Sequence, residues 1–136
     1  MKRGILAIVV LFVFWSLADY LIHGVLLSSV YQATSNLWRP MAEMKMFLIH
    51  ITVFISAIIF VLIYALFFKN KAIGSGLGYG FLYGLGAGIS MGYGTYAVLP
   101  IPYKMALIWF MGTLIEATLG GFLLGLLLSN KTGRIN

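Results

Sequence analysis

Four long apolar stretches dominate the chain, and short polar segments separate them. They cover about residues 4–30, 46–68, 73–98 and 105–128. Each is long enough to cross a hydrocarbon core of about 30 Å, which takes roughly 20 helical residues. Because the runs are continuously apolar and do not alternate, we expect helices rather than the strands of a barrel. The pattern predicts an all-α integral membrane protein, a four-transmembrane-helix bundle that forms a single domain over residues 1–136.

The composition excludes several other classes of protein. Of the 136 residues, 62% are hydrophobic and 9% are charged, and there is no cysteine. A soluble domain of similar size buries only about 70% of the surface of its chain, so it could not hide this much apolar surface. An ordinary soluble enzyme, a disordered chain and a disulfide-stapled domain are therefore excluded. The net charge of +6 has no soluble basic face to carry it, so we expect no nucleic-acid partner.

The basic residues predict how the chain is oriented. Four crossings would place six of them on one side: Lys2, Arg3, Lys69, Lys71, Lys131 and Arg134. The other side would hold Arg39, Lys45 and Lys104. Because short basic loops stay in the cytoplasm, both termini are predicted to be cytoplasmic. No small-residue cleavage site precedes Asp19, so we expect the first apolar run to be an uncleaved helix rather than a signal peptide.

The two halves of the chain share a weak internal similarity. A shift of 62 residues carries Gly24 onto Gly86 and Pro40 onto Pro102. One interpretation is a pair of repeated helical hairpins, an arrangement known in transporters. The other is chance, because apolar sequences often match one another.

Glycine recurs at every fourth position of the third apolar run. The row consists of Gly76, Gly80, Gly84, Gly88 and Gly92. Residues four apart lie on one helix face, and a strip of small residues lets a neighbouring backbone approach closely. The strip predicts helix packing. It leaves open whether the partner is another helix of the bundle, a second copy of the chain in a homo-oligomer, or a larger membrane complex.

Four ionisable residues lie within the apolar runs, where such groups are costly and indicate function. Asp19 and His23 share one helix face, His50 lies near the start of the second run, and Glu116 lies in the middle of the fourth. The first hypothesis is a site that binds or relays a proton or a cation. Alternatives are a haem held between His23 and His50, as in a membrane subunit of a respiratory complex, and a transition metal held by both histidines and Asp19. Structural roles for the histidines also remain open.

The first outer loop offers a different kind of site. Trp38 and Arg39 precede Pro40 at the expected level of the lipid headgroups, where aromatic and basic anchors are common. A contact between Arg39 and a headgroup or another anion is the functional alternative. The sequence contains no nucleophile–base pattern, metalloprotease motif or cofactor fingerprint, so an enzyme is not indicated.

A longer pattern connects these residues. Asp19-Tyr-Leu-Ile-His23-Gly24 is followed by Leu37-Trp38-Arg39-Pro40, and later by Trp109 and Glu116. This pattern resembles an uncharacterised family of small four-helix bacterial inner-membrane proteins. The resemblance implies the bacterial inner membrane as the location and a four-helix architecture, and it implies no activity or cofactor.

Overall fold

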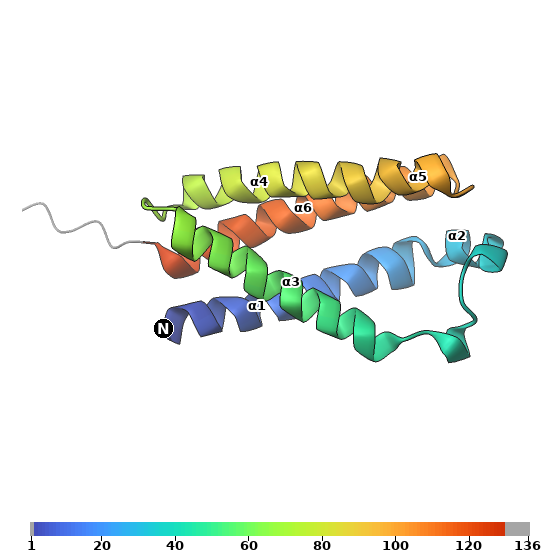
Figure 1. Cartoon of the computed structure of the whole chain (residues 1–136), viewed down its shortest axis with the longest axis horizontal. Helices are drawn as coiled ribbons and strands as arrows, with labels where there is room; N and C mark the ends of the chain where they lie inside the picture. Colours follow the sequence, from blue (N-terminus) through green and yellow to red (C-terminus); the bar gives the residue numbers. More distant parts are fainter. Residues whose placement is uncertain (1, 130–136) are drawn as a thin grey trace, which may run out of the picture.

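The computed structural model describes residues 2–129, which form an all-helical structure with 87% helix and no strand in that range (Figure 1). Lys131 and Arg134, on which the charge argument draws, lie outside these residues. The longer helices are α1 (Lys2–Asp19), α3 (Met46–Phe67), α4 (Ile73–Ile89) and α6 (Tyr103–Leu128). The shorter ones are η1 (Tyr20–Leu26), α2 (Ser28–Ala33), η2 (Ser35–Leu37), η3 (Met41–Glu43), η4 (Ser90–Gly94) and α5 (Thr95–Val98).

Three helices are long and apolar enough to cross a membrane, which supports the prediction of a membrane protein. They cover Lys2–Leu26, Met46–Phe67 and Tyr103–Leu128. The third predicted span, residues 73–98, is continuous helix through α4, η4 and α5, and it ends just before Leu99 and Pro100 as expected. It is not among the three, because its many glycines lower its apolar content.

The first apolar run is less regular than predicted. A single helix was expected over about residues 4–30, but α1 passes into the π-helix η1 at Tyr20. The Leu27 amide donates to the Ile22 carbonyl at 2.9 Å, five residues back, which is the π-helical pattern. A π-helical segment rotates the residues that follow it relative to α1. It contains His23, so it sets the direction of that imidazole.

The glycine strip packs against α6, which confirms the prediction of close helix packing. All five of its residues are buried. A Cβ on Gly80 would overlap the Ala117 carbonyl oxygen, and one on Gly88 would lie 2.8 Å from the Phe110 carbonyl oxygen. The partner helix belongs to the same chain, and α4 lies beside α6 along its whole length (Figure 1).

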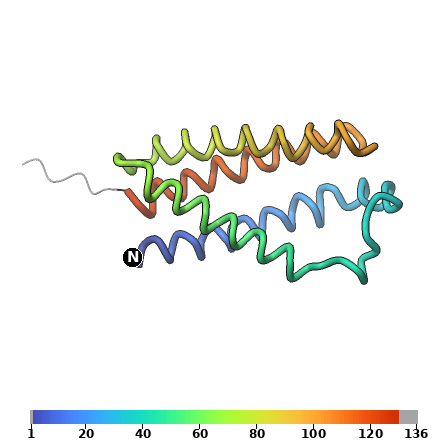
Figure 2. The backbone as a smooth tube through the Cα atoms, viewed as in Figure 1, coloured from blue at the N-terminus to red at the C-terminus, as the bar shows by residue number. Residues whose placement is uncertain are grey.

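The two helical hairpins differ in geometry. Helices α4 and α6 run side by side, whereas α3 crosses α1 and diverges from it toward the loop that contains η2 and η3 (Figure 2). At the crossing, the ring centroids of Phe12 and Phe54 are 5.4 Å apart, and those of Trp15 and Phe60 are 5.1 Å apart. Large side chains therefore hold α1 and α3 apart. Glycines, in contrast, let the backbones of α4 and α6 lie close together. The predicted repeat is not confirmed.

The buried apolar residues form two clusters. The larger includes Leu11, Trp15, Phe60, Tyr64 and Tyr79. The smaller, nearer the outer loop, is formed by Leu27, Ile101, Met105, Ala106 and Trp109. Trp15 and Trp109, one from each cluster, both line the cavity described next, which therefore lies where the two clusters meet.

Candidate functional site

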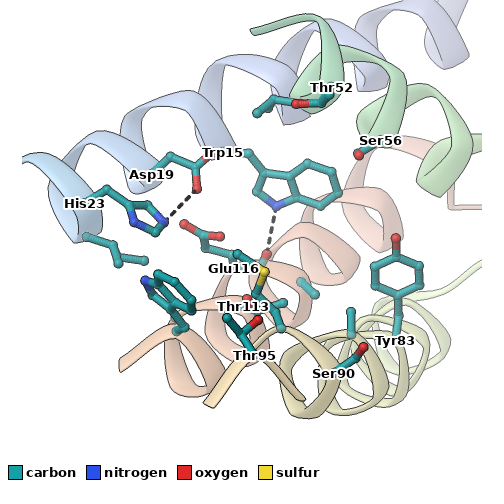
Figure 3. A pocket seen from close by; sticks show the side chains of 17 residues that line it. Trp15, Asp19, His23, Thr52, Ser56, Tyr83, Ser90, Thr95, Thr113 and Glu116 are labelled. Atoms are coloured by element: carbon teal, nitrogen blue, oxygen red, sulfur yellow. Dashed lines mark hydrogen bonds and ion pairs between the residues drawn. The ribbon is translucent and has the colours of Figure 1, made fainter. Parts of the chain in front are cut away.

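A cavity of about 660 Å³ lies between the two hairpins. Its lining comes from α1 with η1, from α3, from α4 with η4 and α5, and from α6 (Figure 3). The lining residues are Trp15, Asp19, Ile22, His23, Thr52, Val53, Ser56, Tyr83, Ala87, Ser90, Met91, Thr95, Trp109, Gly112, Thr113, Glu116 and Ala117. Two carboxyl groups, one imidazole and several hydroxyl groups are among them, and no described Lys or Arg is.

Three of the four predicted ionisable residues face this cavity together. His23 Nε2 lies 3.9 Å from Asp19 Oδ1, at ion-pair distance. Figure 3 shows the carboxyl group of Glu116, from α6, directed toward this pair. The side chains of Asp19 and His23 are 35% and 39% exposed, so the group is partly rather than fully buried. The structure thus brings Asp19, His23 and Glu116 to one cavity.

The hydrogen bonds of Tyr31 orient His23. Trp109 Nε1 donates to the Tyr31 hydroxyl oxygen at 3.0 Å, and the same oxygen lies 2.7 Å from His23 Nδ1. Burial raises the pKa of Tyr31, so its hydroxyl keeps a proton to donate. The oxygen accepts from Trp109 with one of its two lone pairs, and we assign its own proton to the bond with Nδ1. In the neutral imidazole, the N–H group is then Nε2, which faces Asp19.

An aromatic cluster surrounds this hydrogen-bonded chain. The ring of Tyr31 lies 5.4 Å from that of Trp38, and Trp38 lies 6.1 Å from Trp109, centroid to centroid. The indole N–H of Trp38 donates to Thr34 Oγ1 at 2.9 Å. Trp38, predicted as a headgroup anchor together with Arg39, instead packs at the outer end of the site, while Arg39 is exposed. A headgroup contact of Arg39 stays a prediction.

Glu116 lies at an interface between helices, as its flanking glycines predict. A Cβ on Gly112 would lie 2.8 Å from Ile22 Cδ1, and one on Gly120 would lie 3.2 Å from Leu11 Cδ2, so η1 and α1 cover this face of α6. Trp15 Nε1 donates to the backbone carbonyl of Glu116 at 3.1 Å. The Oε1 atom of Glu116 is buried and has no hydrogen-bond partner within residues 2–129. Glu116 itself lines the cavity, and this oxygen is left without a compensating donor among the described residues.

His50 does not join the other three, which corrects the prediction of a four-residue set. It is exposed and does not line the cavity, because α3 diverges from η1 at this end (Figure 1). Neither the facing histidine pair of a haem site nor the metal set of His23, His50 and Asp19 is formed. In the described part of the chain, no three or more His, Cys, Asp and Glu side chains are grouped so that they could hold a metal ion.

Several site residues were not predicted from the sequence. The hydroxyl groups of Thr52, Ser56, Ser90, Thr95 and Thr113 line the cavity from three helices. Hydroxyl residues are common in membrane helices, so a single sequence does not distinguish the ones that line a cavity. Tyr31 carries a weak signal, because it follows His23 by eight residues, close to two helical turns.

In comparisons with known proteins, no protein family, curated protein or solved structure matches the chain. The resemblance to small inner-membrane proteins therefore stays a prediction.

Proposed function

We propose that the protein is a small multi-pass membrane protein whose cavity binds or relays a proton or a cation through Asp19, His23 and Glu116. One observation carries the proposal: two carboxyl groups from different helices share a cavity that no described Lys or Arg lines. An ionised carboxylate away from water is costly unless a positive charge compensates it. A proton or a bound cation would supply that compensation.

The order of the groups suits transfer as well as binding. Tyr31 and Trp109 hold His23 at the outer end, Asp19 follows one helical turn away, and Glu116 faces both from α6. Imidazole gains and loses a proton near neutral pH, which makes His23 the natural exchange point between the carboxyl groups and the outside. His50, which lies apart from the cavity, has no part in this proposal.

For the chain as a whole, the proposal is four spans in a bacterial inner membrane, with both termini in the cytoplasm. The helical run from Ile73 to Val98 lies against α6, which is itself apolar enough to span. A helix packed so closely against a spanning partner shares its membrane environment. The distribution of basic residues supports the orientation.

Proton transfer can be tested in liposomes that contain the purified protein and a pH-sensitive dye. Under an imposed potential, the wild-type protein should acidify or alkalinise the lumen faster than empty liposomes do. Glu116→Gln and Asp19→Asn, which remove a charge at nearly constant shape, should each slow this flux by about 100-fold or more, since general acid–base contributions are typically about 10²–10⁴-fold.

The matched control is Glu43→Gln, because Glu43 is an exposed carboxyl residue in the outer loop, outside the cavity. It should transport like the wild type. The same assay with Na⁺ or K⁺ gradients tests a cation in place of a proton. Equal fluxes for wild type, Asp19→Asn and Glu116→Gln with every ion would reject the proposal.

A further inference from the structure

We propose that the cavity takes a monovalent organic cation with an apolar body, whose charge lies between Asp19 and Glu116. This inference rests on the proposed function and names the class of cation. It is drawn from the size of the cavity, from its aromatic residues and from the state of the polar groups in its wall.

The size of the cavity favours an organic ligand over a bare ion. At about 660 Å³ it falls within the range of small-molecule sites, roughly 300–1,000 Å³. A single water occupies about 30 Å³ in the liquid, so a proton or a metal ion would fill a small part of this space. A metal ion also needs several converging ligands, and the described residues form no such group.

The aromatic residues favour a cation with apolar substituents. Trp15, Tyr83 and Trp109 all line the cavity. The indole N–H groups of both tryptophans are already engaged, with the Glu116 carbonyl and with the Tyr31 hydroxyl. The rings therefore offer their carbon surface to a ligand, and such surface attracts organic cations through the negative face of the π-system.

The remaining wall can accept hydrogen bonds and carries negative charge. Glu116 lines the cavity, and its Oε1 atom is buried without a partner within residues 2–129. Thr52 donates its hydroxyl hydrogen to the Ile49 carbonyl at 2.7 Å, so its oxygen remains an acceptor. A wall of this kind matches a positively charged ligand, and an anion would meet two carboxyl groups without a basic partner.

Some lipid headgroups also carry an organic cation, an ammonium group. The depth of Glu116 along α6 favours a free cation over such a headgroup. Glu116 lies 13 residues after Tyr103, where α6 begins, which is about 20 Å along the helix axis. A headgroup would have to leave the interface to reach it. We therefore assign the site to a free amphiphilic cation.

The inference can be tested with tetraphenylphosphonium as the probe. The full chain in a neutral detergent is titrated, and binding is followed by tryptophan fluorescence and by calorimetry. We expect saturable binding to one site, with triphenylphosphine oxide, a neutral analogue of similar shape, binding about tenfold more weakly or worse, a factor that corresponds to about 1.4 kcal/mol. Equal binding of the two compounds to the wild type would overturn the inference, and this comparison needs no variant.

Variants of the two carboxyl residues test where the positive charge of the ligand lies. Asp19→Asn and Glu116→Gln should each weaken tetraphenylphosphonium binding about tenfold while barely changing binding of the oxide. Glu43→Gln should leave both unchanged. Tetraphenylphosphonium binding that is unaffected by Asp19→Asn and by Glu116→Gln would overturn the inference. Competition by phosphatidylethanolamine, but not by phosphatidylglycerol, would overturn the assignment to a free cation.

Failure of this inference can be told apart from failure of the proposed function. If the wild type does not bind tetraphenylphosphonium but Asp19→Asn and Glu116→Gln slow ion flux in liposomes, the organic-cation inference is wrong and the proposed function stands. If binding and flux are both absent in the wild type, both proposals are wrong.

Discussion

The hydroxyl group of Tyr31 joins residues that are far apart in the chain. It accepts from Trp109, 78 residues away, and lies 2.7 Å from His23. The bonds connect the end of the first apolar run to α6. They also set which nitrogen of His23 faces Asp19, so a single oxygen atom determines how the imidazole is presented to the cavity.

Removal of that oxygen should lower the free energy of unfolding slightly and should change the favoured tautomer of His23. Tyr31→Phe keeps the ring but deletes both hydrogen bonds, each worth about 0.6 kcal/mol on average in membrane proteins, so the free energy of unfolding should fall by about 1 kcal/mol. The nitrogen NMR signals of His23 should show that Nε2–H is no longer the favoured tautomer.

The matched control for this variant is Tyr20→Phe. Tyr20 lies in η1, the segment that carries His23, and is 67% exposed. The control should change neither the unfolding free energy nor the His23 signals. A His23 tautomer that is the same in Tyr31→Phe as in the wild type would show that the hydroxyl does not orient the ring.

Residues of the site differed in how well the sequence predicted them. Asp19, His23 and Glu116 were predictable because charged groups in apolar helices are costly and therefore conspicuous. His50 carried the same signal, but helix divergence places it outside the cavity, and periodicity says nothing about divergence. The contacts of Trp109 and Trp38 with Tyr31 depend on tertiary packing, which spacing along one helix does not reveal.

At the level of elements, the glycines on two faces of α4 have different surroundings. Those of the glycine strip lie against α6, and Gly74 and Gly78 lie outside the strip. A Cβ on Gly76 or Gly80 would overlap a backbone carbonyl of α6, whereas one on Gly74 or Gly78 would meet no atom of the described residues within 4 Å. The four-residue spacing predicted the strip, but it could not predict which helix packs against it. The π-helix at Tyr20–Leu26 had no sequence signal that we recognised.

This contrast gives a matched pair of substitutions two residues apart. Gly80→Ala should push α4 away from α6 and lower the unfolding free energy by about 2 kcal/mol, as overpacking does. Gly78→Ala should be neutral or stabilise the helix slightly, because alanine has the higher helix propensity. Unfolding by denaturing detergent in mixed micelles measures both.

Similar losses of unfolding free energy in Gly80→Ala and Gly78→Ala would contradict the close contact between Gly80 and α6. They would indicate a general effect of alanine on this helix rather than a steric effect of one face.

At the scale of the molecule, the number of spans decides where the termini lie. The sequence correctly predicted a helical membrane protein from apolar runs alone. The first, second and fourth of those runs are confirmed as long and apolar enough to cross, and the third, residues 73–98, which is rich in glycine, is not. An odd number of crossings would place the termini on opposite sides, and an even number would place them on the same side.

Reporter fusions can determine whether the number of membrane crossings is odd or even. A cytoplasmic fluorescent reporter at either end of the chain should be active, and a periplasmic phosphatase should be active only when it is inserted in the outer loop near Asn36. Phosphatase activity at one terminus and fluorescence at the other would instead establish three crossings.

The glycine strip also affects how the chain enters a bilayer. Each glycine that admits the backbone of α6 takes an apolar side chain away from α4, so the helix with the closest partner has the weakest affinity of its own for lipid. In a four-span arrangement, α4 would leave the insertion machinery poorly if released alone. It would be retained until α6 is synthesised, and the last two helices would partition into the membrane as one hairpin.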